Sequence, residues 1–412
     1  MKKFIVLLLI SQTLIAEDPV RSKAATIIQD QAGPVWKTPV LTIDLKSDAE
    51  WKASPQVSFD PQGRLLVLYR DKKKTSPQGN WHLVRITNPL GSLHTRQELV
   101  FAPAEEPADP DRSRTWDSTH VRLYASDDGN QVYAVFEGAT VTRKPGPHAV
   151  NGLRNVESRY FTNAVSLDMK SLKVSAKRDL TSELSYAVAA AVDLHGNLLV
   201  LQFDKSSFQV TTLSSALARQ APAVTMPRAG ELMQSCFLQR DTTIQCLRKN
   251  EVVHITPEGQ HLFAHLDPGW IMDGQLLASQ AGWIVAAYRL DEDQVIAEER
   301  LWQIDGKGEL VLSSDILTPK CREGWNGSTV SSDGMSLLAA CYETTGFLDY
   351  FYRLTRADLQ LFNASTLKFQ GALKLPSRQQ NDYAVWHEKG QTVVAVLQNG
   401  VKLKLYRIED QH

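Results

Sequence analysis

Residues 325–376 decide the fold; they read WNGSTVSSDGMSLLAACYETTGFLDYFYRLTRADLQLFNASTLKFQGALKLP. The stretch predicts a short strand, a tight turn at SSDG, an apolar strand, a long connection, and a second hairpin that turns at 363–365. Tight hairpin turns favour Gly, Asp and Asn, and such residues stand at both bends. The segment therefore predicts a four-stranded antiparallel sheet, but it indicates no activity.

Weaker copies of this segment recur along most of the chain. The shared phrase is an apolar strand, a turn with Asp or Gly, and a strongly apolar strand, and it occurs at 57–69, 123–136, 190–203, 236–247, 276–288, 329–342 and 383–397. The chain has 412 residues, and the 396 that follow Ala16 give about 57 for each of seven units. Four-stranded units of this size bury their faces only by stacking on neighbours, as β-propeller blades do.

The last copy supplies three strands rather than four. A further strand at 38–45 (TPVLTIDL) precedes the first full unit and is the natural donor of the missing one. A ring closed in this way has no open sheet edge at its ends. The sequence therefore predicts an all-β fold, a single seven-bladed β-propeller of four-stranded antiparallel blades, closed by an N-terminal strand that completes the last blade.

The turn of each copy has a glycine, or one other residue in its place, at the same point. Six copies have a glycine there and the fourth has Thr242 in its place; the glycines are Gly63, Gly129, Gly196, Gly282, Gly334 and Gly390. Glycine is one of the residues that tight hairpin turns favour, and its regular recurrence, with Thr242 in one place, marks seven turns along the chain.

The phrases SSDGMSLLAACY and LQLFNASTLKFQGALKLP resemble those of YVTN-type and WD-like bacterial β-propeller repeat proteins. The resemblance covers most of the chain after about Trp51, through turn and strand patterning. Propellers of this kind serve as binding platforms, lactonases, quinoproteins and assembly factors. The resemblance thus implies a fold and leaves the function open.

The N-terminal residues MKKFIVLLLISQTLIA follow the pattern of a secretory signal peptide, with Lys2 and Lys3 before a short apolar run. Ser11 and Gln12 interrupt that run too early for a membrane-spanning helix, although an uncleaved anchor remains the alternative. We expect a signal peptide at 1–16, a flexible lead-in at 17–35 and the propeller at 36–412. The protein is then exported from a bacterial cell, to the periplasm or beyond.

Four cysteines fit an oxidising compartment. Cys236 and Cys246 flank a predicted hairpin turn symmetrically, which places them opposite each other on adjacent strands. Cys321 and Cys341 form the natural second pair. A four-cysteine metal site is the alternative, but the chain lacks the C-x-x-C spacing that such sites use.

The tight turns all belong to one face of the predicted ring, and the opposite face carries the long connections at 71–80, 102–117, 137–158 and 343–357. Long loops on a rigid scaffold usually carry function. We therefore expect the binding surface there, and its candidate residues are Lys72, Lys73, Lys74, Arg114, Trp116, Arg143, Lys144, Arg154, Phe347, Tyr350 and Arg353. The alternatives are solvated loop charges and an aromatic loop that buries its own rings.

The composition argues against a nucleic-acid partner, because Lys+Arg 45 against Asp+Glu 46 gives a net charge of -1. The Walker-type loop, the G-x-S-x-G elbow and H-E-x-x-H are absent from the sequence. We therefore expect a monomeric, non-catalytic binding or scaffolding module without a cofactor, which recognises a protein or a cell-envelope component.

A metal-assisted hydrolase or lactonase-like enzyme is the second reading. It uses polar residues that precede the innermost strands and converge on the central channel, namely Asp117, Asp273, Asn326 and Asp382. Carboxylate and amide oxygens are the ligands that calcium takes. The alternative is that these residues line the channel structurally.

Overall fold

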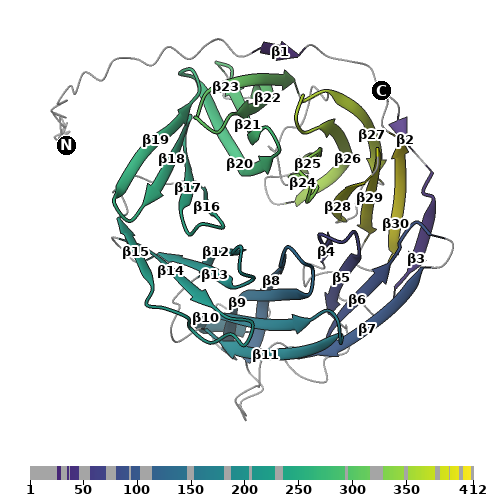
Figure 1. Cartoon of the computed structure of the whole chain (residues 1–412), viewed down its shortest axis with the longest axis vertical. Helices are drawn as coiled ribbons and strands as arrows, with labels where there is room; N and C mark the ends of the chain where they lie inside the picture. The colour runs from purple at the N-terminus through teal and green to yellow at the C-terminus, as the bar shows by residue number, and fades with distance from the viewer. Residues whose placement is uncertain are drawn as a thin grey trace.

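The computed structural model describes residues 26–28, 35–36, 38–45, 56–70, 80–91, 94–102, 114–145, 153–180, 187–203, 207–227, 235–292, 296–315, 328–347, 351–375, 381–388, 390–398 and 402–409. These residues form the strands β1 to β30, which build seven sheets around a central opening (Figure 1). The architecture confirms a seven-bladed β-propeller and the fold-level resemblance to propeller repeat proteins. In the described part of the chain, no helix is long and apolar enough to cross a membrane.

The first four blades each contain four consecutive antiparallel strands. Blade 1 contains β4 (Gln56–Phe59), β5 (Leu65–Arg70), β6 (Trp81–Thr87) and β7 (Thr95–Phe101). Blade 2 contains β8 (Arg114–Ala125), β9 (Gln131–Pro145), β10 (Leu153–Asp168) and β11 (Lys173–Asp179). Blade 3 contains β12 (Ala187–Val192), β13 (Leu198–Phe203), β14 (Ser207–Leu213) and β15 (Val224–Pro227). Blade 4 contains β16 (Ser235–Leu238), β17 (Ile244–Arg248), β18 (Glu251–Thr256) and β19 (Gly259–His265).

The last three blades take strands from the N-terminal part of the chain. Blade 5 contains β20 (Trp270–Ser279), β21 (Gly282–Leu290), β22 (Ile296–Ile304) and β23 (Leu310–Asp315), with β1 (Thr26–Ile28) added. Blade 6 contains β24 (Ser328–Val330), β25 (Ser336–Phe347), β26 (Phe351–Asn363) and β27 (Phe369–Leu375), with β2 (Val35–Trp36) added. Blade 7 contains β28 (Asn381–Glu388), β29 (Gln391–Gln398), β30 (Lys402–Glu409) and β3 (Leu41–Asp44).

The N-terminal strand β3 closes the ring as predicted. It pairs antiparallel with β30, and Leu41 lies opposite Leu405 in the register. Leu45, which follows β3, is buried in the core cluster that joins blades 7 and 1. We call the boundary between these two blades the seam.

Two further N-terminal strands, β1 and β2, lie outside the ring. Each adds in parallel to the outermost strand of a blade, β1 to β23 and β2 to β27 (Figure 1). They fall in or at the end of the predicted lead-in at 17–35. Strands of three and two residues are too short to show a period-2 pattern in the sequence.

The apolar core consists of clusters that lie between neighbouring blades. At the seam, Val67 of blade 1 and Leu397 of blade 7 belong to the same buried cluster. All six residues of β5 are buried, because the second strand of a blade has neighbouring strands on both sides and blades on both faces.

A tight A–B turn joins the first and second strands of each blade, and in blades 2 and 6 an Asp of this turn acts as an internal cap. In blade 2, Asp128 Oδ1 accepts hydrogen bonds from Ser126 Oγ at 2.6 Å and from the Asn130 backbone N–H at 2.9 Å. These hydrogen bonds lower the pKa of Asp128 to about 2. Asp333 makes the same contacts in blade 6, with Ser331 at 2.5 Å and Met335 at 3.1 Å.

Two of the long connections predicted as loops are paired strands. Residues of 137–145 pair with residues of 153–162 in β9 and β10, and 343–347 pair with residues of 351–356 in β25 and β26. The first of these connections, which includes Gly138 and Pro145, was predicted to be a loop. Its intervening Thr and Val residues have high strand propensity, and the ladder of the blade continues through them.

One predicted disulfide is present, and the other involves a cysteine that lies outside the described residues. Cys236 and Cys246 lie opposite each other on β16 and β17 and form a disulfide with a Cα–Cα distance of 4.1 Å. This confirms the first predicted pairing. Cys321 lies outside the described residues, so its pairing with Cys341 stays a prediction.

The turn residue Thr242 has the backbone conformation that its glycine counterparts adopt. Its φ is 70°, and φ lies between 62° and 79° at Gly63, Gly129, Gly196, Gly334 and Gly390. The sequence alignment of the repeats had placed Thr242 at this position. A β-branched residue is sterically disfavoured there.

We expect Thr242→Gly to raise the free energy of unfolding by about 0.5–1 kcal/mol, because removal of the steric cost of positive φ outweighs the chain entropy that glycine adds to the unfolded state. Chemical denaturation of the purified protein measures this change. Thr243→Gly is the matched control; it removes a hydroxyl that donates to Asp241 Oδ1 at 2.6 Å and should lower stability. If Thr242→Gly had a lower free energy of unfolding than the wild type, the proposal that the backbone is strained at Thr242 would be wrong.

Candidate functional site

A long β-ribbon extends blade 2 on the face opposite the A–B turns. We call that face the loop face, and we call residues 139–145 and 153–160 the basic hairpin. β9 and β10 have 15 and 16 residues, whereas the corresponding β5 and β6 of blade 1 have 6 and 7. At about 3.3 Å per residue, the nine additional residues of each strand make the ladder about 30 Å longer.

The basic hairpin brings together four of the predicted binding residues. Lys144 lies opposite Arg154, and Arg143 lies opposite Asn155. Arg114, on β8, lies opposite Thr142 and is thus next to Arg143 along the ladder. Two positive residues therefore occupy directly opposed positions of one ladder, where like charges are destabilising.

A second ribbon extends blade 6 on the same loop face. We call residues 343–347 and 351–356 the aromatic hairpin. Phe347 lies opposite Phe351, and Gly346 lies opposite Tyr352. Arg353 lies opposite Thr345. The aromatic residues expected in one loop are therefore placed at the end of a paired ladder.

The other predicted binding residues are distributed less closely. Trp116 lies on β8 opposite Thr140, at the base of the basic hairpin. Lys72, Lys73, Lys74 and Tyr350 lie outside the described residues. The structure thus brings the predicted residues of blade 2 together, and it places Phe347 and Arg353 on a different blade.

Asp382 connects the innermost strands of the first and last blades. It lies on β28, and its Oδ2 accepts a hydrogen bond from the Val57 backbone N–H of β4. Burial raises the pKa of the Asp382 carboxyl to about 7, and the N–H groups of Val57 and Tyr383 act in the opposite direction. The side chain therefore links blades 7 and 1 at their innermost strands, and its carboxyl titrates near neutral pH.

The predicted metal residues lie on different blades, and one of them lies outside the described residues. Asp117 lies on β8 and Asp273 on β20, in blades 2 and 5, and Asn326 lies outside the described residues. Among the described residues, no group of three His, Cys, Asp or Glu side chains has a geometry suited to a metal ion. The calcium reading stays a prediction.

Polar contacts link the turns on the opposite face, which we call the turn face. Arg240 in blade 4 forms a two-pronged ion pair with Asp127 in blade 2, with Nη1 at 3.0 Å from Oδ2. His387 Nδ1 of blade 7 lies 2.6 Å from Asp333 Oδ2 of blade 6. These contacts join blades through their turns.

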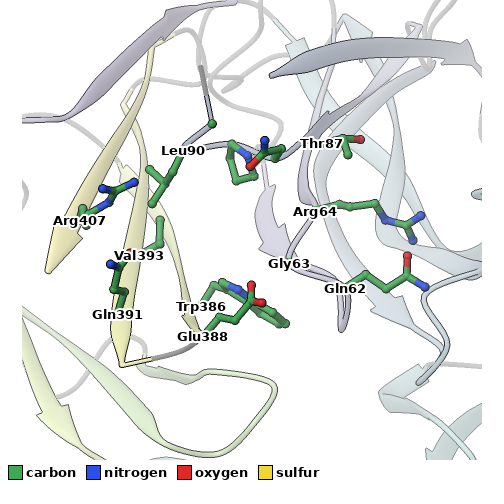
Figure 2. A pocket seen from close by; sticks show the side chains of 13 residues that line it. Gln62, Gly63, Arg64, Thr87, Leu90, Trp386, Glu388, Gln391, Val393 and Arg407 are labelled. Carbon is green, nitrogen blue, oxygen red and sulfur yellow. The ribbon is translucent and has the colours of Figure 1, made fainter. Parts of the chain in front are cut away.

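A pocket of about 530 Å³ opens at the seam on the turn face (Figure 2). We call it the seam pocket, and its lining residues are Gln62, Gly63, Arg64, Thr87, Asn88, Pro89, Leu90, Gly91, Trp386, Glu388, Gln391, Val393 and Arg407. Blade 1 contributes two of its turns, and blade 7 contributes β28, β29 and β30. The volume lies within the range of small-molecule sites.

The indole of Trp386 forms part of the pocket wall because Gly63 leaves room for it. A Cβ at Gly63 would approach Trp386 Cε2 to 2.8 Å. Arg64, on the blade 1 side, is held in place by Asp60, with Nε at 2.5 Å from Oδ2, and by the Gly129 carbonyl of blade 2. The pocket wall thus contains a fixed guanidinium from blade 1 and an aromatic ring from blade 7.

Sequence reasoning missed this pocket because it assigned no role to the turn face. One signal was available. Trp386 stands where the other copies have Phe59, Ala125, Val192, Leu238, Ala278 and Val330 at the residue before the turn. A tryptophan that replaces smaller side chains at one copy of a repeat marks a local departure from the shared packing.

No protein-family model and no curated protein sequence matches the chain. Among solved structures, it is similar to a chain of a mitotic checkpoint complex, at 12% identity over 99% of each chain with a TM-score of 0.49. It is also similar to virginiamycin B lyase from Staphylococcus aureus, at 12% identity over 89% of this chain and 98% of that one, with a TM-score of 0.47. A third is the Cps50 (Swd1) β-propeller domain of Myceliophteria thermophila, at 11% identity over 88% and 99%, with a TM-score of 0.46. Similarity of this extent carries no information on what the chain binds.

We expect Asp382→Asn to change the pH dependence of stability. The carboxyl has a pKa of about 7 in the folded protein and about 4 when unfolded, so folding of the wild type becomes less favourable as pH rises from about 4 to about 7. The asparagine variant has no carboxyl to ionise at this position, so it does not lose this stability. Its free energy of unfolding should therefore exceed that of the wild type by an amount that grows between about pH 4 and about pH 7, to at most about 4 kcal/mol and less if solvent reaches the side chain. Denaturation series at several pH values measure it; parallel profiles for the two proteins would contradict the assignment.

Proposed function

We propose that the chain is an exported, non-catalytic binding protein that recognises a protein or cell-envelope component through the loop face. β-Propellers commonly mediate protein binding, and this one has long ribbons on a single face. The observation that carries the proposal is the basic hairpin, where the ladder of blade 2 extends beyond the length of its neighbours and ends in Lys144 opposite Arg154.

Opposed positive residues favour a partner that carries negative charge. Within the ladder they are unfavourable, and an acidic surface brought against them removes that repulsion. The positive charge also steers an acidic partner toward this face before contact. Arg114 and Arg143 add to the same sector of the ring.

The aromatic hairpin supplies a second element of the same surface. Aromatic and Arg residues are enriched at the energetic centres of protein interfaces. Phe347, Phe351 and Tyr352 lie together at the end of this ladder, with Arg353 beside them. A partner that spans both hairpins would meet charge on blade 2 and apolar surface on blade 6.

Export is supported by the signal pattern at 1–16 and by the Cys236–Cys246 disulfide, which is favoured in oxidising compartments. If the protein is exported and cleaved as proposed, the protein recovered from the periplasm or medium should begin at or near Glu17. N-terminal sequencing of the full-length gene product after fractionation measures this. Recovery of the uncleaved chain in the membrane fraction would contradict cleavage and favour an anchor.

Lys144→Glu tests the binding surface with little risk to the fold. The variant replaces a like-charge pair by an opposite-charge pair with Arg154, so the stability of the ladder should stay the same or rise by about 0.2–1 kcal/mol. Capture of an acidic partner should fall by at least about tenfold, because one attractive contact becomes repulsive. The measurement combines thermal unfolding with a binding titration of the captured partner.

Lys177→Glu is the matched control, because Lys177 is exposed on the outer strand β11 of the same blade and carries the same charge change. A photo-crosslinking residue at position 143 should label the partner, and one at position 177 should not. Unchanged capture by Lys144→Glu, or equal labelling from both positions, would overturn the assigned surface.

A further inference from the structure

The seam pocket combines groups that suit a small, singly charged, hydroxyl-bearing molecule. It lies on the turn face, opposite the two hairpins, so the inference is independent of the proposed function. Its lining joins an indole, two guanidinium groups, a carboxylate and several side-chain amides (Figure 2). Convergent polar groups around an aromatic surface are typical of small-molecule sites.

Arg407 provides a guanidinium for a ligand. The residue is exposed on β30, opposite Val393 of β29, and its guanidinium makes no ion pair or hydrogen bond with another described residue. Arg64 differs, because Asp60 and the Gly129 carbonyl already bind its guanidinium. A planar guanidinium matches a carboxylate through two parallel hydrogen bonds.

The net charge of the lining limits the charge of the ligand. Asp60 compensates Arg64 within the wall, and Glu388 lies on the pocket lining with Arg407 (Figure 2). Two guanidinium groups and two carboxylates make these groups neutral together, so a single carboxylate on the ligand adds less unfavourable negative charge than a doubly charged phosphate. Glu388 can in turn accept hydrogen bonds from hydroxyl groups.

The remaining lining offers neutral hydrogen-bonding groups and an aromatic platform. Gln62, Asn88 and Gln391 carry side-chain amides, each of which both donates and accepts. The Gln62 amide nitrogen is fixed by the Asp128 carbonyl at 2.5 Å. Trp386 lines the pocket beside Glu388 (Figure 2), and the C–H face of a sugar ring can pack on an indole.

We infer that the seam pocket binds an acidic sugar, a pyranose that carries one carboxylate. Its carboxylate pairs with Arg407, its hydroxyls bond to the amides and Glu388, and its ring packs on Trp386. Because the lining comes from blades 1 and 7, the bound sugar contacts both sides of the seam. Binding therefore stabilises the closed ring, since a ligand that binds only the folded state raises its stability.

Isothermal titration calorimetry on the full-length mature protein tests the inference. The probes are D-glucuronate, D-galacturonate, N-acetylmuramate and N-acetylneuraminate, with D-glucose and inorganic phosphate for comparison. At least one acidic sugar should bind with one site per chain and raise the thermal unfolding midpoint. The neutral sugar and phosphate alone should bind at least about tenfold more weakly, because each lacks one of the two recognised parts.

Three variants locate the site. Arg407→Gln should weaken acidic-sugar binding by at least about tenfold, and Arg407→Lys should retain part of the affinity, because it keeps the charge but loses the planar fork. Lys177→Gln removes the same charge far from the pocket and should bind as the wild type does.

Four results would overturn the inference. They are no binding of any acidic sugar up to about 10 mM, equal binding of glucose, equal binding of phosphate, and unchanged affinity in Arg407→Gln. Equal binding of phosphate would identify a general anion site instead. None of these results depends on partner capture by the hairpins, so failure here leaves the proposed function unaffected.

Discussion

Each blade has two apolar sheet faces that only another blade can cover, and the ring depends on this constraint. The chain connects six of the junctions between blades in order. The seventh, at the seam, joins the last blade to the first, and non-covalent pairing of β3 with β30 closes it. The same junction contains a shared apolar cluster, the Val57–Asp382 hydrogen bond and the packing of Trp386 on Gly63. The seam therefore contains both the contacts that close the ring and the seam pocket, which blades 1 and 7 line together.

The repeat allowed most of the fold to be predicted from the sequence. Turn residues at a regular spacing indicated seven units, and the three-stranded last unit pointed to the donor strand at 38–45. The symmetric spacing of Cys236 and Cys246 predicted their bridge, which the structure confirms. These features are visible because each depends on a local pattern that the chain repeats. β1 and β2 were not predicted, since their pairing depends on the position of distant outer strands.

The functional surfaces were less predictable for a related reason. The stretch from Gly138 to Pro145 combines turn formers with strand formers, and only the adjoining ladder decides between loop and ribbon. The basic residues were identified as candidates, but the opposition of Lys144 and Arg154 follows from a register that the sequence does not reveal. The seam pocket takes its lining from stretches far apart in the chain, around Gly63, Asn88, Trp386 and Arg407. Its chemistry exists only once the ring is closed.

The pairing of β3 with β30 also bears on how the protein acquires its structure. Residue 41 is made before blades 1 to 6, and its partner at 405 is made after them. Blades 1 to 6 can therefore form while the faces of blades 1 and 6 that blade 7 covers are still exposed. Contacts between distant residues are slow to form, and exposed apolar sheet invites aggregation in the interval. If the chain is exported as proposed, it would pass through this interval after crossing the membrane, where protection of the two open faces would determine the yield of folded protein.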